Sequence, residues 1–207
     1  LIHRLLGVMP EHFSIVALAV TGSQAVETAL KTAFQRTKRF RVVCFDGGYH
    51  GVDLGVVALS ARREFRDPFV PWLREDLVTR LPWQCDGSRL VAELKREDVA
   101  AVVVEPVQGR GGMRSASEPW LHSLREHCST YGTLLVYDEV FTGIGRSGTM
   151  SWAHRVPSDL SCFGKALGGG MPISACVGTS DAMRGWPRSQ GEAIHTGTFF
   201  GHPLSCR

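Results

Sequence analysis

The sequence predicts an α/β fold in which helices cover both faces of a mostly parallel sheet. Short apolar runs rich in β-branched residues alternate with stretches of helical periodicity. These runs are apolar throughout rather than at every second position, which is typical of strands covered on both faces. The 207 residues suffice for one large domain or two small ones, and a hydrophobic content of 43% excludes a disordered or fibrous chain.

Strands and helices alternate along the chain. Strands are predicted at residues 15–20, 41–45, 99–104 and 133–137, and helices at residues 24–36, 88–97 and 118–131. Thr21 and Gln24 fit a capping box at the start of the first helix, and Gly132 is a stop signal for the third. The stretch 62–75, with two prolines and several arginines, is expected to be a long irregular connection.

Charge and cysteine usage narrow the class of protein. The net charge is +3 without a run of Lys or Arg, so neither nucleic acid nor a membrane surface is an expected partner. No apolar run approaches the roughly 18 residues of a membrane span, and no signal-peptide pattern is present. The six cysteines show no CxxC spacing, so we expect reduced, mostly structural thiols and no metal site. A cytoplasmic protein is the expectation.

Two charged side chains follow apolar runs. Lys165 follows a short apolar run and precedes three glycines, where a desolvated amine can attack a carbonyl. The alternative is a surface lysine at the start of a loop. Asp138 follows the run 133–137, at the edge of a parallel sheet where ligands bind, and its carboxylate could hold a proton on a ring nitrogen. The alternative is an aspartate that caps the next turn.

Two further groups of residues follow predicted strands. Gly22 and Ser23 lead from a strand into a helix, whose first N–H groups can bind a phosphate; simple capping is compatible with that role. Tyr49 could stack on a flat ring, whereas His50 is expected to be structural. A phosphate cradle, an aromatic ring, a carboxylate and a reactive lysine are the parts that pyridoxal 5′-phosphate requires.

Several motifs in one order make the sequence resemble a known family. It is similar to the class III aminotransferases of fold type I, the group that acts on acetylornithine, ornithine and 4-aminobutyrate. The resemblance spans nearly the whole chain and is carried by TGSQAVETALK (21–31), YHG (49–51), EPVQGRGG (105–112), DEVFTGIGRSG (138–148), GKALGGG (164–170) and GTFFGHPL (197–204).

The resemblance implies a site for pyridoxal 5′-phosphate. The implied cofactor-binding residues are Gly22, Ser23, Tyr49, Asp138, Val140, Lys165 and Thr198. Lys165 would form a Schiff base with the cofactor and carry the proton during catalysis. Asp138 would keep the pyridine nitrogen protonated, and Val140 and Tyr49 would pack on the two ring faces. Backbone groups of Gly22 and Ser23 would bind the phosphate.

The resemblance also implies partners and a reaction. Thr198 would reach the phosphate in the neighbouring subunit, so a homodimer is expected, and Glu105 would lie on the substrate side. The implied reaction moves an amino group, that of an ω-amino acid such as acetylornithine, ornithine or 4-aminobutyrate, to a 2-oxo acid. An aminomutase or racemase shares these motifs. Phe141 departs from the family, where glutamine is common near the cofactor's 3-hydroxyl.

Two other interpretations remain. The sequence Gly143-Ile-Gly-Arg-Ser-Gly148 follows a strand as a dinucleotide-binding turn does, but residues 149–154 are a poor helix start and Asp159 comes too early for the acidic partner. Family members also carry an N-terminal segment and a C-terminal small domain. Residues 1–207 are expected to be the cofactor-binding large domain without either flank, which leaves a truncated, non-catalytic fold as an alternative.

Overall fold

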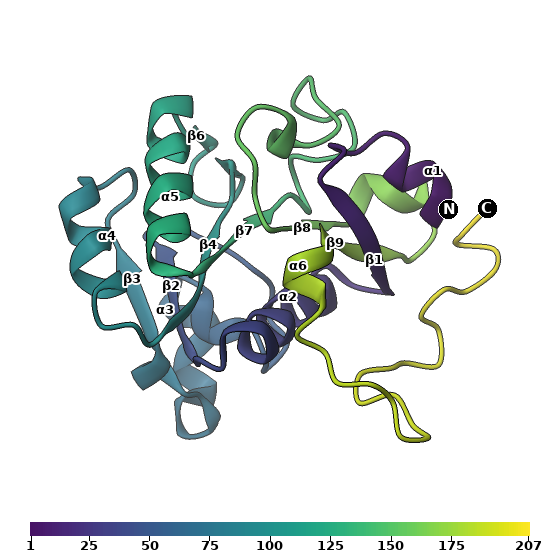
Figure 1. The fold of residues 1–207 in the computed structure, drawn as a ribbon, viewed down its shortest axis with the longest axis horizontal. Coiled ribbons are helices and arrows are strands. Elements are labelled where there is room, and N and C mark those ends of the chain that lie inside the picture. Colours follow the sequence, from purple (N-terminus) through teal and green to yellow (C-terminus); the bar gives the residue numbers. More distant parts are fainter.

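A seven-stranded sheet runs through the centre of the computed structural model, which describes residues 1–207 (Figure 1). The strand order is β1-β9-β8-β7-β4-β2-β3. In chain order these strands are β1 (Phe13–Ala19), β2 (Arg41–Phe45), β3 (Val78–Leu81), β4 (Val99–Val104), β7 (Leu134–Asp138), β8 (Leu160–Phe163) and β9 (Ser174–Thr179). A separate hairpin pairs β5 (Val107–Gln108) with β6 (Arg114–Ser115).

The predicted mostly parallel sheet is confirmed. Each neighbouring pair from β8 through β7, β4 and β2 to β3 is parallel. Only β9 is reversed, because it pairs antiparallel with both β8 and β1. Consequently β1 points the same way as the five parallel strands, and the carboxyl ends of six strands lie along one edge of the sheet.

Helices cover both faces, as predicted, and each face has its own core. On one face α2 (Gly22–Thr37) and α6 (Ser180–Met183) pack against the sheet through a cluster of 19 buried residues. On the other, α1 (Ile2–Leu6), α4 (Gly87–Leu94) and α5 (Glu118–Tyr131) contribute to a cluster of 23. All six residues of β4 are buried, which explains its uninterrupted apolar sequence.

The structure corrects some predicted elements. The strand predicted at 15–20 begins at Phe13, ends at Ala19 and lies at the sheet edge, where it is half exposed rather than covered on both faces. The stretch 62–75 is not irregular, because it contains α3 (Arg63–Arg66) and a 3-10 helix at Asp67–Trp72, in which Pro68 fits the first turn. Residues 143–148 form turns and open no helix, which argues against the dinucleotide-binding alternative.

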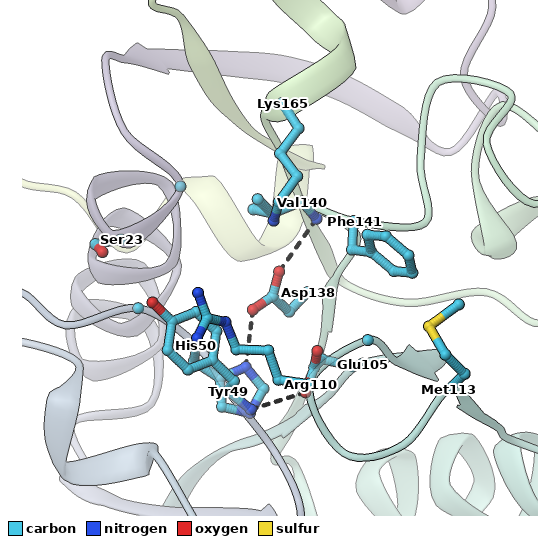
Figure 2. Close-up of a pocket in the computed structure, with 13 residues that line it drawn as sticks. Ser23, Tyr49, His50, Glu105, Arg110, Met113, Asp138, Val140, Phe141 and Lys165 are labelled. Carbon is cyan, nitrogen blue, oxygen red and sulfur yellow. Dashed lines mark hydrogen bonds and ion pairs between the residues drawn. The ribbon is translucent and has the colours of Figure 1, made fainter. Parts of the chain in front are cut away.

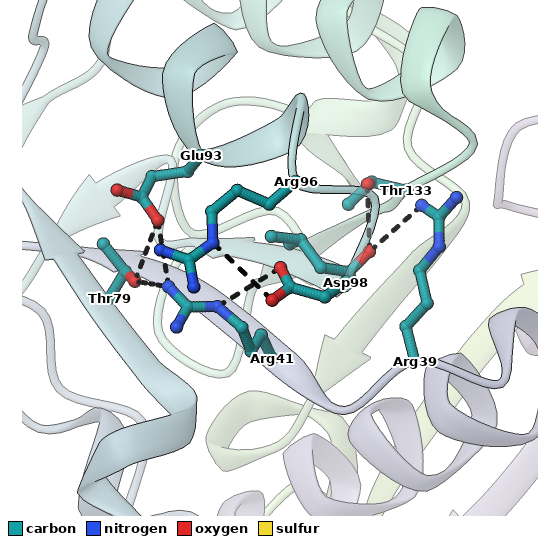
Figure 3. A network of polar contacts seen from close by, with 8 residues as sticks. Arg39, Arg41, Thr79, Glu93, Arg96, Asp98 and Thr133 are labelled. Carbon is teal, nitrogen blue, oxygen red and sulfur yellow. Dashed lines mark hydrogen bonds and ion pairs between the residues drawn. The ribbon is translucent and has the colours of Figure 1, made fainter.

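Polar contacts tie together the edge of the sheet where the parallel strands begin (Figure 3). Arg41, at the start of β2, donates to Glu93 on α4 at 2.9 Å and to Thr79 on β3 at 2.6 Å. The same guanidinium pairs with Asp98, just before β4, at 3.3 Å. This edge is therefore occupied by structural contacts, and the opposite edge is left for a binding site.

None of the six cysteines forms a disulfide. No helix combines the length and the apolar character needed to cross a membrane. No three or more His, Cys, Asp or Glu side chains are grouped as ligands for a metal ion.

Candidate active site

A cavity of about 500 Å³ lies where the parallel strands end (Figure 2). The turns that follow β1, β2, β4, β7 and β8 all contribute to it, because parallel strands deliver their carboxyl ends to one edge. It is lined by Gly22, Ser23, Tyr49, His50, Gly51, Glu105, Gly109, Arg110, Met113, Asp138, Val140, Phe141 and Lys165.

Asp138, the last residue of β7, lies in the middle of this cavity (Figure 2). One carboxylate oxygen accepts the backbone N–H of Val140 at 3.1 Å, so the aspartate does cap the following turn, which is the alternative interpretation given above. The other accepts Nδ1 of His50 at 2.8 Å, and both side chains are buried. Burial disfavours the charged ring, but the bond to Asp138, its charge and that of Glu105 outweigh it and raise the pKa of His50.

Glu105 follows β4 and lies beside this pair. Its Oε2 accepts the backbone N–H of Tyr49 at 2.8 Å, which ties the loop after β2 to the end of β4. Burial raises the pKa of Glu105 well above its usual range; His50 opposes this shift and Asp138 adds to it. His50 therefore has a clear structural role, as predicted, between two carboxylates at the base of the cavity.

The start of α2 supplies the opposite wall. The predicted capping box is present: Thr21 Oγ1 accepts from Gln24 N at 3.2 Å, and Gln24 Oε1 accepts from Thr21 N at 3.2 Å. The N–H groups of Gly22 and Ser23 donate to no group in the structure. A Cβ at Gly22 would lie 2.8 Å from Cγ1 of Val140, so only glycine lets this backbone approach so closely.

Lys165 extends its amine into the cavity toward Asp138 and Val140 (Figure 2). Its φ of +43° is a left-handed conformation that lysine rarely adopts, and such strain is typical of functional sites. The ammonium has no hydrogen-bond or ion-pair partner, and its nearest aromatic neighbour is the Phe141 ring, with the centroid at 5.9 Å. The lysine is thus presented to the cavity by the backbone, with its amine free.

The β5–β6 hairpin adds residues that the sequence analysis missed. Arg110, in the turn of this hairpin, places its guanidinium over the Tyr49 ring at 4.3 Å from the centroid. Met113 from the same turn also lines the cavity. The signal available in the sequence was an arginine among three glycines, Gly109, Gly111 and Gly112, directly after Glu105-Pro-Val-Gln.

Seven of the eight predicted site residues line this cavity, namely Gly22, Ser23, Tyr49, Glu105, Asp138, Val140 and Lys165. The eighth, Thr198, does not. It is exposed, in the segment after α6 that contains no helix or strand (Figure 1).

The residues present fit a flat ring that carries an anionic group. The free N–H groups of Gly22 and Ser23 suit a phosphate, and Asp138 suits a protonated ring nitrogen. Val140 and Tyr49 offer an aliphatic and an aromatic surface for the ring, and Lys165 offers an amine for a carbonyl.

Known proteins resemble this chain over nearly its whole length. The sequence profile of the family "Aminotransferase class-III" matches residues 1–207. The acetylornithine aminotransferase of Methanopyrus kandleri is 35% identical over 199 residues, covering 95% of this chain and 49% of that protein. An amine transaminase from an uncultivated Pseudomonas species, solved in the PLP-bound internal aldimine form, superposes with a TM-score of 0.86 at 29% identity; the match covers 99% of this chain and 53% of that one.

The ornithine aminotransferase of Toxoplasma gondii superposes equally well. Its TM-score is 0.86 at 30% identity, over 99% of this chain and 48% of that one. The chain therefore spans about half the length of the curated relatives and solved structures that it matches.

Proposed function

The chain belongs to the class-III aminotransferase family, and from this we propose that it binds pyridoxal 5′-phosphate in the cavity and transfers amino groups. In the proposed reaction an ω-amino acid such as acetylornithine, ornithine or 4-aminobutyrate gives up its terminal amine to a 2-oxo acid. We further propose that residues 1–207 act as the cofactor-binding large domain. The observation that carries the proposal is the free Lys165 amine facing Asp138 across one cavity.

Each residue has a stated task in this proposal. Bound in this cavity, the cofactor supplies an electron-withdrawing ring that stabilises negative charge on the substrate carbon. The N–H groups of Gly22 and Ser23 bind its phosphate, and Val140 and Tyr49 hold the ring between them. Asp138 keeps the proton on the ring nitrogen, and His50 fixes the orientation of that carboxylate through its 2.8 Å bond. The Nζ atom of Lys165 binds the cofactor and then accepts and returns the substrate proton.

The proposed assembly is a homodimer in which Thr198 contributes to the neighbouring subunit's site. Its absence from the cavity of its own chain supports this arrangement. So do the exposed apolar side chains in the same segment, Ile194, Phe199 and Leu204, each more than 60% exposed. Glu105 is proposed to face the substrate, and Phe141 gives this side of the cavity an apolar wall.

Reductive trapping tests the proposed function. The purified protein is incubated with pyridoxal 5′-phosphate, reduced with borohydride and mapped by peptide mass spectrometry. We expect a phosphopyridoxyl adduct on Lys165 and its loss in Lys165→Ala. Lys31, whose ammonium is already paired with Glu27 at 2.7 Å, is an internal control outside the cavity. Adducts spread evenly over the lysines, or none at Lys165, would contradict the proposal.

A further inference from the structure

Arg110 is the one arginine that lines the cavity. Its guanidinium lies 4.3 Å from the centroid of the Tyr49 ring and 5.8 Å from that of Phe65. These two rings meet edge to face, with centroids 5.6 Å apart and ring planes at 65°. An arginine stacked in this way keeps the edge of its planar guanidinium available for hydrogen bonding.

The guanidinium of Arg110 has no partner in the structure. It donates no hydrogen bond and pairs with no carboxylate, whereas Arg41 and Arg125 are both bound to acidic side chains. The carboxylates of the cavity are already engaged, Asp138 by His50 and Glu105 by the Tyr49 N–H. Five N–H donors therefore remain free beside the cavity.

The backbone that carries Arg110 is held firmly. The Arg110 carbonyl accepts from Arg62 at 3.0 Å, and Met113 N closes the turn on the Gln108 carbonyl at 2.9 Å. Side chains of Gln108 and Arg114 both donate to the Asp46 carbonyl, at 3.0 and 2.8 Å. The turn is thus fixed from several sides and the Arg110 guanidinium lies on the Tyr49 ring, while its N–H donors are unpaired, which is the arrangement of a preorganised binding group.

The charges that line the cavity make Arg110 the suitable group for an anionic substrate. Amino acids and 2-oxo acids both bring a carboxylate, yet Asp138 and Glu105 are acidic. Lys165 is reserved for the cofactor in the proposed function, and His50 is buried against Asp138. We propose that Arg110 binds the carboxylate of the substrate, through a two-point contact along the edge of its guanidinium. It thereby makes the site selective for carboxylate substrates over simple amines. This inference rests on the proposed function.

Glutarate provides a direct binding test, because this dicarboxylate has neither an amino nor an oxo group and does not react. Its affinity for the protein loaded with pyridoxal 5′-phosphate is measured by titration calorimetry. We expect Arg110→Gln to weaken glutarate binding by about 10- to 100-fold, as for a lost charge-assisted contact. Arg110→Lys should retain part of the affinity, and Arg89→Gln on α4, an equal change of charge outside the cavity, should retain all of it.

Donor preference gives a second readout. We expect Arg110→Gln to raise the half-saturating concentration of 4-aminobutyrate in the amine-donating half-reaction and to leave that of butylamine unchanged. Unchanged glutarate affinity in Arg110→Gln, or no glutarate binding by the wild type, would overturn the inference. The inference would also be overturned if the wild type formed the Lys165 adduct and Arg110→Gln did not, because the arginine would then serve the cofactor. A wild-type protein without that adduct counts against the proposed function instead, and against this inference with it.

Discussion

Glu139, next to Asp138, is a buried carboxylate that points away from the cavity. It accepts hydrogen bonds from the Ser151 hydroxyl at 2.5 Å and the Trp152 N–H at 2.8 Å. These bonds join the two ends of the loop that follows β7, and so they fix the backbone of Val140, the next residue. Burial nevertheless raises the pKa of Glu139 to about 7, with the two hydrogen bonds opposing the shift.

This shift predicts a pH-dependent stability. The pKa of Glu139 is higher in the folded chain, about 7, than its ordinary value of 4.5, so the folded state favours the protonated acid. The stabilisation that this raised pKa gives the folded state is complete below pH 4.5. It is lost as the pH rises to 7, because the unfolded state then releases a proton that the folded state retains. Glu139→Gln mimics the protonated acid. Its free energy of unfolding, relative to the wild type, should rise by up to about 3 kcal/mol between pH 5 and pH 8.

Urea unfolding at the two pH values measures this difference. Glu126→Gln is the matched control, since Glu126 lies on the exposed side of α5 and has no ion-pair partner. A Glu139→Gln variant whose relative stability is the same at pH 5 and pH 8 would show that the carboxyl is ionised normally in the folded protein.

Single residues also show how far the sequence predicts the site. Asp138 and Lys165 could be predicted because each comes at or just after the end of an apolar run, and strand ends of a parallel sheet meet. Arg110 was missed, because its place depends on a two-residue strand pair, β5–β6, that has no recognisable periodicity. The bond between His50 and Asp138 joins residues 88 positions apart, and no local pattern predicts such a contact.

Among the elements, α2 connects stability with binding. Its capping box satisfies the Gln24 N–H and leaves those of Gly22 and Ser23 facing the cavity. Thr21→Ala removes the cap and should lower the free energy of unfolding by about 1 kcal/mol. Because the same turn is the proposed phosphate site, the variant should also bind pyridoxal 5′-phosphate several-fold more weakly, as measured by absorbance titration.

Asp86→Ala on α4 is the control for this prediction. Asp86 caps its helix by accepting the Ser88 N–H at 2.9 Å, and α4 contributes nothing to the cavity. Asp86→Ala should lower the free energy of unfolding by a similar amount without changing the affinity for the cofactor. Equal cofactor affinities in Thr21→Ala and Asp86→Ala would show that the start of α2 is not the phosphate site.

Strand prediction succeeded where a long apolar run was almost wholly buried and failed for short strands whose limits the sequence does not mark. The strands at 41–45 and 99–104 match β2 and β4 to the residue, because both are central and almost wholly buried. Strand β3 at the opposite edge and strands β8 and β9 were not predicted. The last two are short, and each merges into glycine- or serine-containing turns that hide its limits. The reversal of β9 depends on sheet pairing, which a single strand's sequence does not encode.

At the scale of the whole molecule, the sheet and the turns that follow its strands build the cavity, and the segment after α6 lines no part of it. Residues 184–207 contain no helix or strand and contact α2 through Trp186 Nε1 to Thr32 at 2.9 Å and His195 Nε2 to Thr28 at 2.9 Å. Thr198 lies beyond these contacts, outside the cavity. A site that needs Thr198 is therefore incomplete within one chain, and a second copy can complete it.

Mixed assemblies test that arrangement. Lys165→Ala lacks the reactive amine, and Thr198→Ala lacks the proposed phosphate contact. If Thr198 serves the neighbouring subunit, a hybrid of the two variants contains one native site, made of Lys165 from one copy and Thr198 from the other. Cofactor affinity at that site, measured by borohydride trapping at limiting pyridoxal 5′-phosphate, should return to the wild-type value in half of the sites of each hybrid. If Thr198 acts within its own chain, every hybrid site carries one of the two defects, and no site of wild-type affinity appears at any mixing ratio.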